Sequence, residues 1–291
     1  MIFLTGDVHH TDPRMGDQAR LTSGWSEVRT CEPYLECAGK YSVRLTLFFT
    51  GLAVARDAEF ISSLKERYDF EIGGHTYTAN GCRRLLGASR RLLGLANGPY
   101  WLQKKDMIAT VGCMKQRLGV PVVSWRNHAY RMDRNTYRIA AEAGIEQVSN
   151  RVSGVDGTIK KVGAILEVPI NTLPDHESLG HDYHPRMCHS VQEWVDKVLG
   201  QVEYQQKQGL PSIILAHPLC MFVEDRLEAF ERLCAAIGQE KTGHLRECAS
   251  LTVEHFGEHL HQPNRLTGST PSLEIQISTH RGRPAENAHR N

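Results

Sequence analysis

Short strand-forming runs alternate with segments of helical periodicity from residue 2 to residue 238 of this 291-residue chain. The predicted strands are apolar runs at 2–4, 43–49, 70–72, 121–125, 145–149, 164–170 and 212–216. The predicted helices lie between and after them, at 26–40, 56–67, 101–118, 134–143, 190–207 and 223–238. This alternation specifies an α/β protein with a parallel sheet and helical crossovers. Six or seven such units fit a (β/α) barrel with outer helices better than two separate domains.

The barrel is predicted to be a single domain, because neither a linker nor an internal repeat interrupts residues 1–261. From residue 262 onward the chain is polar and aperiodic and offers few anchors for a core. We therefore expect residues 262–291 to form a disordered tail. The stretch 82–96 alternates basic and leucine pairs at helical spacing, which predicts an ordinary surface helix rather than a membrane-binding one.

Composition argues against several classes of function. The chain has 34 Lys and Arg against 33 Asp and Glu, so the basic surface of a nucleic-acid-binding protein is not expected. It has neither an apolar run of about eighteen residues nor a basic leader at the N-terminus, which argues against a membrane partner and favours the cytoplasm. Serine hydrolases, P-loop NTPases and dinucleotide enzymes are disfavoured, because their glycine-rich motifs do not occur. The oligomeric state is left open.

Polar residues follow five of the predicted strands at the point where each strand ends. In a parallel barrel these ends converge on one face, where functional side chains gather. Random scatter of the fifteen histidines would not favour this register. The residues are Asp7 with His9 and His10, His75, Arg126 with His128, Asp175 with His176, and His217.

Three of these positions suggest specific roles, each with an alternative. Asp7 and His9 point the same way in an extended chain and could share an ion or a water, or Asp7 could simply cap a helix. Arg126 could hold a carboxylate by a two-pronged hydrogen bond or form an ordinary salt bridge. His217 follows the most apolar strand, so it is either a half-buried proton-transfer group or a packed histidine. Cys220 is only weak evidence for a nucleophile.

Five short motifs occur in order along residues 1–256. In this order they resemble the polysaccharide deacetylase family, the NodB-homology type of carbohydrate esterase. Each motif is weak alone, but the five together at these spacings are fairly specific. The resemblance implies a distorted barrel of βα units. The motifs are Leu4-Thr5-Gly6-Asp7-Val8-His9, Leu45-Thr46-Leu47-Phe48-Phe49-Thr50-Gly51, Glu71-Ile72-Gly73-Gly74-His75-Thr76, Trp125-Arg126 and Leu215-Ala216-His217.

The sequence departs from this family at three places. Val8 and His9 stand where a second acid usually serves as a metal ligand, so His9 would replace a carboxylate. Ala79 stands where a second histidine usually follows the first by four residues. Asn127 follows Arg126 where prolines are usual. The resemblance implies a divalent metal ion, with zinc expected first, held by His75 and His9 with a third ligand from His10, His128, Asp175 or His176.

The resemblance also implies a metal-dependent hydrolase that removes an acyl group, first of all acetyl, from an amide nitrogen of a carbohydrate or other sugar-containing substrate. Asp7 would be the general base, Arg126 would keep it ionised, and His217 would protonate the leaving amine. Substitution of Asp7 or His217 is expected to reduce turnover severely and to leave stability nearly unchanged. The substrate-binding residues are expected to be His128, Asp175 and His176.

Two alternatives stay open. A metal-dependent barrel of the amidohydrolase or PHP type would require His-x-His after the first strand, whereas His9 and His10 are adjacent. A non-catalytic descendant of the fold that binds a glycan or another partner is supported by Ala79.

Overall fold

An eight-stranded sheet forms the centre of the protein in the computed structural model, which describes residues 1–12, 17–79, 89, 91–92, 94–180 and 187–251. The strand order is β6-β7-β5-β4-β3-β2-β1-β8, and every neighbouring pair is parallel except β6 and β7. The predicted α/β fold is therefore confirmed, as a mostly parallel sheet curled into a half-barrel. The strands are β1 (Ile2–Val8), β2 (Leu45–Phe49), β3 (Phe70–Gly74), β4 (Ser124–Trp125), β5 (Gln147–Val148), β6 (Lys160–Val162), β7 (Ile165–Glu167) and β8 (Ser212–Leu215).

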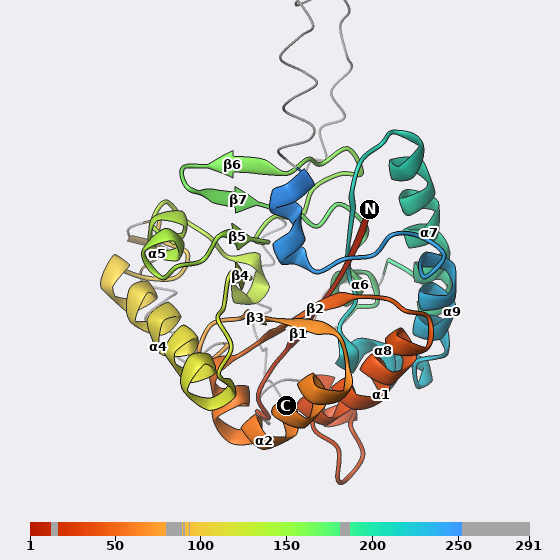
Figure 1. The fold of residues 1–291 in the computed structure, drawn as a ribbon, viewed down its shortest axis with the longest axis horizontal. Helices are drawn as coiled ribbons and strands as arrows, with labels where there is room; N and C mark the ends of the chain where they lie inside the picture. The colour runs from red at the N-terminus through yellow and green to blue at the C-terminus, as the bar shows by residue number, and fades with distance from the viewer. Residues whose placement is uncertain (13–16, 80–88, 90, 93, 181–186, 252–291) are drawn as a thin grey trace, which may run out of the picture.

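Helices surround this sheet, with α4 and α5 on one side of the molecule and α7 and α9 on the other (Figure 1). Ser26, Thr50 and Ser190 each accept a backbone N–H through their side chains and cap α1, α2 and α7. None of the helices in the described ranges combines the length and the hydropathy needed to cross a membrane. The helices are α1 (Glu27–Lys40), α2 (Gly51–Arg67), α4 (Tyr100–Leu118), α5 (Thr136–Glu142), α6 (Asp175–Ser178), α7 (Val191–Lys207), α8 (Pro218–Asp225) and α9 (Glu228–Ile237), with 3-10 turns at Asp17–Arg20, His128–Tyr130 and Leu245–Glu247.

The core lies on both faces of the sheet, because alternate residues of a strand point to opposite sides. Ile2, Leu4 and Ile214 belong to the larger buried cluster, which includes apolar side chains of the surrounding helices. Phe3 and Ile213 belong to a second, smaller cluster on the other face, inside the curl of the sheet. Strands buried on both faces read as continuous apolar runs, which is why they are visible in the sequence.

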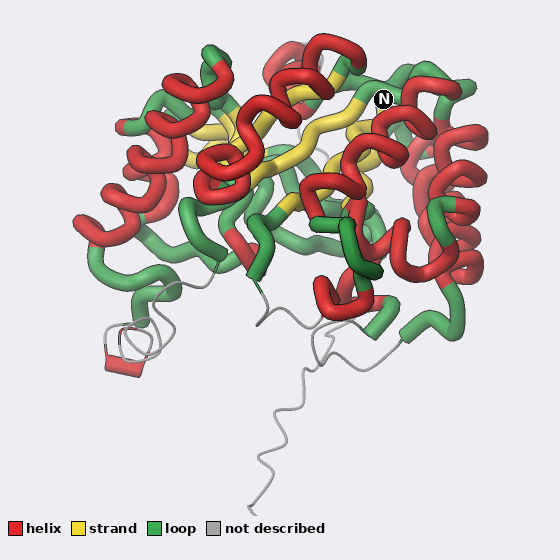
Figure 2. Tube along the Cα trace, turned by 90° about the horizontal axis from the view of Figure 1, so that it is seen from below, coloured by secondary structure: helices red, strands yellow, loops and turns green. Residues whose placement is uncertain are grey.

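An irregular joint connects β8 to the segment that follows β7. The backbone N–H of Asn171 donates to the carbonyl oxygen of Ile213 at 3.3 Å, and the side-chain oxygen of Asn171 accepts the N–H of Ile213 at 2.8 Å. A side chain therefore replaces part of the backbone ladder where the barrel would otherwise close. The loops after the strands gather at the end of the barrel opposite the N-terminus (Figure 2).

Two glycines in β3 allow large rings to lie against that strand. A Cβ atom at Gly73 would lie 2.5 Å from the ring of Phe48, and one at Gly74 would lie 2.5 Å from the ring of Trp125. Any side chain at these positions would have to displace an aromatic ring of a neighbouring strand. This close packing fixes the position of the next residue, His75, relative to the neighbouring strands.

The structure differs from the predicted elements in several places, and β4, β5 and β7 are shorter than the predicted strands. The helix expected at 223–238 is two helices, because Arg226 and Leu227 have φ values of 56° and 75° and turn the chain between α8 and α9. Strand β6 was not expected, because its three residues are exposed and carry no apolar pattern. Helix α2 begins at Gly51, five residues before the predicted start at 56. The tail at 262–291 and most of the stretch 82–96 lie outside the described residues.

Candidate active site

The register of the strands places the predicted functional residues at one level of the barrel. The last paired positions of β1 to β4 are mutual neighbours across the sheet. Backbone N–H groups of the residues directly after β2, β3 and β4 continue each ladder by one hydrogen bond. On the other side of β1, Thr5 pairs with Leu215, so Asp7 and His217 come two residues later on adjacent strands. The residues brought to the common level are His9, Thr50, His75 and Arg126.

Asp7 lies at the centre of this group and is 3% exposed. Its Oδ1 accepts a hydrogen bond from a guanidinium nitrogen of Arg126 at 2.9 Å. Its Oδ2 lies 3.7 Å from Nε2 of His217 and 3.9 Å from Nε2 of His75. Burial alone would raise the pKa of Asp7, but the charge of Arg126, followed by the two imidazoles, outweighs it and lowers the pKa well below its usual range. Asp7 is therefore a carboxylate at neutral pH, with one oxygen facing the two histidines.

Arg126 is a fully buried cation, and each of its three nitrogens donates to a fixed partner. Its Nε donates to the backbone oxygen of Ser149 at 3.0 Å, and its second terminal nitrogen donates to the hydroxyls of Ser149 and Thr5 at 2.8 and 3.0 Å. The guanidinium also lies 4.5 Å from the centre of the Phe48 ring. The fork geometry of Arg thus holds Asp7 in one orientation.

His217 donates two hydrogen bonds to the carboxylate of Asp175. The carboxylate accepts from Nδ1 of the imidazole at 2.7 Å and from the backbone N–H of His217 at 2.6 Å. Burial disfavours the imidazolium, but the Asp175 carboxylate outweighs burial and raises the pKa of His217 to about 10. His217 therefore carries a proton on Nε2 at neutral pH, on the side that faces Asp7.

Asp175 was expected to bind substrate, but in the structure its carboxylate is hydrogen-bonded to His217. The residue is 0% exposed and both of its oxygens are used on His217. It cannot touch a substrate in this arrangement, so it orients and charges His217 instead. Nothing in the sequence pairs the two residues, which are 42 positions apart.

His9 is held by a residue that the sequence analysis missed. Glu27, the first residue of α1, accepts from the backbone N–H of His9 at 2.8 Å and from Nδ1 of its ring at 2.7 Å. Gln18 donates to the other oxygen of Glu27 at 2.8 Å. Burial lowers the pKa of His9, but the neighbouring Glu27 carboxylate acts in the opposite direction, and the net shift of the pKa is upward. A carboxylate on Nδ1 directs Nε2 of His9 into the site.

His75 presents its Nε2 to the same point. Its Nδ1 lies 2.9 Å from the backbone oxygen of Arg126, which must accept, so the proton is on Nδ1 and Nε2 is a free lone pair. Burial, aided by the neighbouring cations, lowers the pKa of His75 to about 3, so the ring is neutral. Nε2 of His75 lies 3.2 Å from Nε2 of His9.

The two imidazoles fit a divalent metal ion. Tetrahedral zinc with bonds of about 2.0–2.1 Å to nitrogen separates two ligand nitrogens by about 3.3 Å. The 3.2 Å between His9 and His75 matches this spacing. Each ring is oriented by an oxygen on Nδ1, the arrangement typical of metal-bound histidines. The ring of His128 lies 5.0 and 5.7 Å from these two rings, and its Nδ1 is buried without a hydrogen-bond partner in the described part of the chain. His128 is therefore the best-placed third imidazole.

His10 and His176, the other expected contributors, lie on different sides of this group. His10 follows His9 and faces the opposite way, with Nδ1 3.3 Å from the hydroxyl of Thr50. The ring of His176 lies 5.3 Å from that of His217, and its Nδ1 lies 3.7 Å from the thiol of Cys220. His176, His217 and Cys220 have ligand atoms within 4.8 Å of one another. A metal there would have to displace the proton of His217, whose pKa is raised to about 10, whereas His75 is already neutral, so the pair that contains His75 is the better metal site.

Comparison with known proteins gives a match at the level of structure. No family model matches the chain, and no curated protein matches its sequence. A protein from Mycobacterium smegmatis assigned to the polysaccharide deacetylases is similar with a TM-score of 0.66 and 18% identity, over 93% of this chain and 95% of that one. A polysaccharide deacetylase assigned in Pseudomonas aeruginosa PAO1 has a TM-score of 0.61 and 14% identity, over 90% and 93% of the two chains.

Other similar structures differ in activity. The Puue allantoinase has a TM-score of 0.63 and 12% identity, over 90% of this chain and 92% of that one. A CE4 family pseudoenzyme from Bacillus anthracis has a TM-score of 0.54 and 14% identity, over 85% and 64% of the chains. At these identities the comparisons establish the fold of this chain, which is that of the polysaccharide deacetylases and CE4 esterases. The activity has to be argued from the site.

Proposed function

We propose that this protein is a metal-assisted hydrolase that removes an acyl group, acetyl in the first place, from an amide nitrogen on a carbohydrate. The observation that carries the proposal is the pair formed by Asp7 and His217. A carboxylate with a lowered pKa and an imidazole with a raised pKa face each other at 3.7 Å in a buried site. Two groups whose pKa values are pushed apart are the arrangement expected of a general base and a general acid.

Asp7 supports the first half of the reaction. A water between Asp7 and the acyl carbon would form the new C–O bond and pass its proton to Oδ2 of Asp7. Arg126 occupies Oδ1, which leaves Oδ2 as the accepting atom. The buried cation also keeps Asp7 ionised before the reaction begins.

His217 supports the second half. Its Nε2 proton would pass to the amide nitrogen as the C–N bond breaks, so that an amine and a carboxylic acid leave. Asp175 holds the Nδ1 side and stabilises the imidazolium until that step. Both proton transfers take place on one face of the substrate, because Oδ2 of Asp7 and Nε2 of His217 lie 3.7 Å apart.

His9 and His75 would hold the metal ion, with His128 as the third imidazole. A divalent ion bound there would polarise the acyl oxygen and lower the pKa of a bound water. The residues of the chain itself supply the orientation: Glu27 fixes His9, and the backbone oxygen of Arg126 fixes His75.

Metal-dependent release of acetate is the result expected of this proposal. The protein stripped with a chelator should release no acetate from di-N-acetylchitobiose, and one equivalent of zinc should restore release. His75→Ala should lose the bound zinc, because the neutral Nε2 lone pair is removed, whereas His189→Ala at an exposed position should keep it. Metal content by mass spectrometry and acetate by NMR are the measurements. The proposal fails if zinc, cobalt and nickel neither bind nor elicit acetate release.

A second candidate function is binding of a glycan without hydrolysis. The observation in its favour is Ala79, which is buried and offers no metal-binding atom where the resemblance leads one to expect a histidine. In that case the same oligosaccharide binds to the protein and no acetate appears with any of the three metals. Calorimetric titration of di-N-acetylchitobiose beside the acetate assay separates the two functions.

Removal of the Glu27 carboxylate should weaken zinc binding. In Glu27→Gln the amide can still accept from His9, but the negative charge behind the imidazole is lost. Changes of this kind typically cost about 10–100-fold in metal affinity. Competition against a fluorescent chelator measures the affinity, and Glu32→Gln on the exposed face of the same helix, where Glu32 pairs with Arg67, is the matched control. Equal affinities for the two variants would contradict the assignment of Glu27 to His9.

A further inference from the structure

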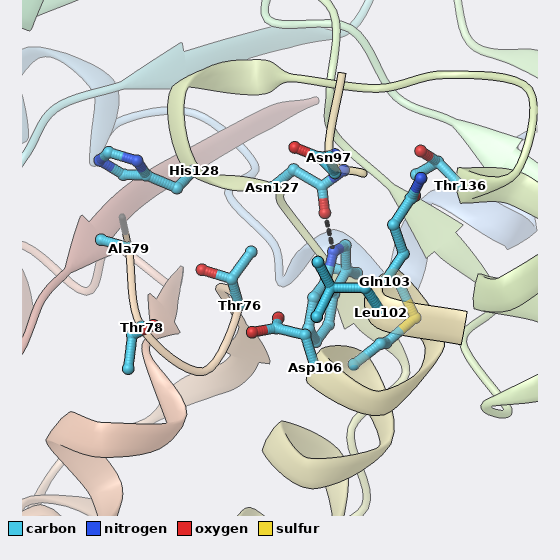
Figure 3. Close-up of a pocket in the computed structure, with 12 residues that line it drawn as sticks. Thr76, Thr78, Ala79, Asn97, Leu102, Gln103, Asp106, Asn127, His128 and Thr136 are labelled. Atoms are coloured by element: carbon cyan, nitrogen blue, oxygen red, sulfur yellow. Dashed lines mark hydrogen bonds between the residues drawn. The ribbon is translucent and has the colours of Figure 1, made fainter. Parts of the chain in front are cut away.

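A cavity of about 110 Å³ adjoins the catalytic group beside His128 (Figure 3). Its walls are the loop after β3, the first half of α4 and the segment after β4. His128 lines this cavity, and its ring lies 5.0 Å from that of His9. A substrate whose acyl group lies between Asp7 and His217 would therefore reach the cavity with a neighbouring substituent.

Most carboxamide N–H groups of the cavity are already used within the protein. Three carboxamide side chains line it, and their nitrogens already donate to protein oxygens. Asn97 and Asn127 donate to the backbone oxygen of Arg131 at 2.7 and 2.5 Å. Gln103 donates to the backbone oxygen of Gly98 at 2.7 Å and to Asp133 at 2.8 Å. These three side chains therefore offer few free N–H groups to a ligand.

Asp106 is the charged group of the cavity. Its Oδ2 accepts the backbone N–H of Tyr77 at 3.0 Å. No Lys, Arg or His of the described chain forms an ion pair with it, and burial raises its pKa to about 6. Its carboxylate points toward the loop that carries Thr76 and Thr78 (Figure 3). At neutral pH this is a mostly ionised, partly buried carboxylate without a counter-ion among the described residues, and a cationic group of a ligand would stabilise it.

Thr76 adds a second acceptor to the cavity. Its Oγ1 is buried and has no hydrogen-bond partner in the described ranges. Its φ of 59° lies in the left-handed region, which is unfavourable for a β-branched residue. Its backbone oxygen accepts the N–H of Gly51, which holds the strained residue in place. Backbone strain that is maintained beside an unpartnered polar atom is typical of functional positions.

We propose that this cavity binds a primary ammonium group of the substrate, with Asp106 as its counter-ion and Oγ1 of Thr76 as a second acceptor. The inference rests on the proposed function, and it narrows the substrate to an amino-sugar oligosaccharide that bears an acylated nitrogen and a free amino group on adjacent units. Asp106 would then select partly deacylated chains over fully acylated ones. A fully acylated neighbour would place an uncharged amide against the carboxylate and lose the ion pair.

The test compares two probes, chitobiose with one N-acetyl group and one free amino group, in either order, and di-N-acetylchitobiose. We expect one of the mono-acetylated isomers to bind the zinc-loaded protein about tenfold more tightly or better at pH 7, because an opposite charge at close range shifts a carboxyl pKa by about 1–3 units and each unit is tenfold in affinity. The preference should shrink as the pH falls through about 6, where Asp106 takes up a proton. Isothermal titration calorimetry gives the affinities.

Variants of Asp106 and Thr76 test whether these two residues bind the ammonium group. Asp106→Asn keeps the acceptor for the N–H of Tyr77 and should abolish the preference, whereas Asp156→Asn, at a surface hydrogen bond with Tyr204, should retain it. Thr76→Val keeps the shape without the hydroxyl and should reduce the preference, which serves as the second test if Asp106→Asn does not fold. Equal binding of the probes, or a preference that persists in Asp106→Asn, would overturn the inference. A preference that depends on Asp106 without any acetate release would overturn the hydrolase alone.

Discussion

Asp7→Asn should lower the rate of acetate release by about 10²–10⁴, the contribution typical of a positioned general base. The side-chain amide keeps the size of Asp7 and can still accept from Arg126, but it cannot take a proton from water. The expected loss falls on kcat rather than on KM, because the substrate contacts are unchanged. Single-turnover assays with the zinc-loaded protein measure it directly.

Controls separate this effect from loss of the metal or of the fold. Asp7→Asn should keep its zinc, because the Nδ1 partners of His9 and His75 are elsewhere. Asp69→Asn, which removes an exposed carboxylate that pairs with Arg44, should retain full activity. Full activity in Asp7→Asn would exclude it as the base.

The pH dependence of acetate release tests the role of His217 as the general acid in the same assays. Activity requires protonated His217, so it should persist at alkaline pH and fall as the pH rises through about 10. Asp175→Asn should move this limb toward the unperturbed imidazole value near 6.5, because the carboxylate is what raises the pKa of His217. An alkaline limb that stays in place in Asp175→Asn would contradict the role given to Asp175.

Arg126→Met should destabilise the folded protein by about 3–5 kcal/mol, the usual effect of leaving one partner of a buried ion pair alone. Arg126 is 0% exposed and Asp7 is 3% exposed, so water cannot replace the lost guanidinium. The variant also leaves the hydroxyls of Thr5 and Ser149 without their donor. Urea unfolding at pH 7, followed by circular dichroism, gives the change in the free energy of unfolding.

Arg232→Met is the matched control for this measurement. Arg232 pairs with Asp196 at the surface, where both side chains are at least 43% exposed, and exposed ion pairs contribute about 0–1 kcal/mol. The contribution of the buried pair should also depend on pH. Because the pKa of Asp7 is lowered in the folded state, the stabilisation is present above about pH 4 and is lost as the pH falls. Similar destabilisation by the two variants would show that the buried pair contributes no more than a surface pair.

The sequence analysis expected substitutions at Asp7 to leave stability nearly unchanged, and the structure argues otherwise. Asp7 is buried against a buried cation, so its removal leaves Arg126 without its counter-ion. Substitution of a general base on an exposed loop would leave stability nearly unchanged, but Asp7 forms a buried ion pair with Arg126. Asp7→Asn should therefore lose stability as well as turnover, and assays should be run well below its unfolding temperature.

Local sequence patterns were enough to predict the order of most strands and helices and the polar residues that follow the strands. Apolar runs of three to seven residues followed by a polar group are local patterns, and the parallel register then brings Asp7, His75, Arg126 and His217 to one place. Exposed or irregular elements such as β6 and the break at Arg226 carry no such pattern and were not predicted.

The residues that support these groups could be identified only from the folded arrangement of the chain. Glu27 reaches His9 across 18 positions and Asp175 reaches His217 across 42, and neither distance corresponds to any local periodicity. Whether the Asp175 carboxylate faces the open site or His217 depends on how α6 packs beside the end of β8. Charge states follow the same rule, because burial and long-range partners, which no stretch of sequence contains, set the pKa of each group.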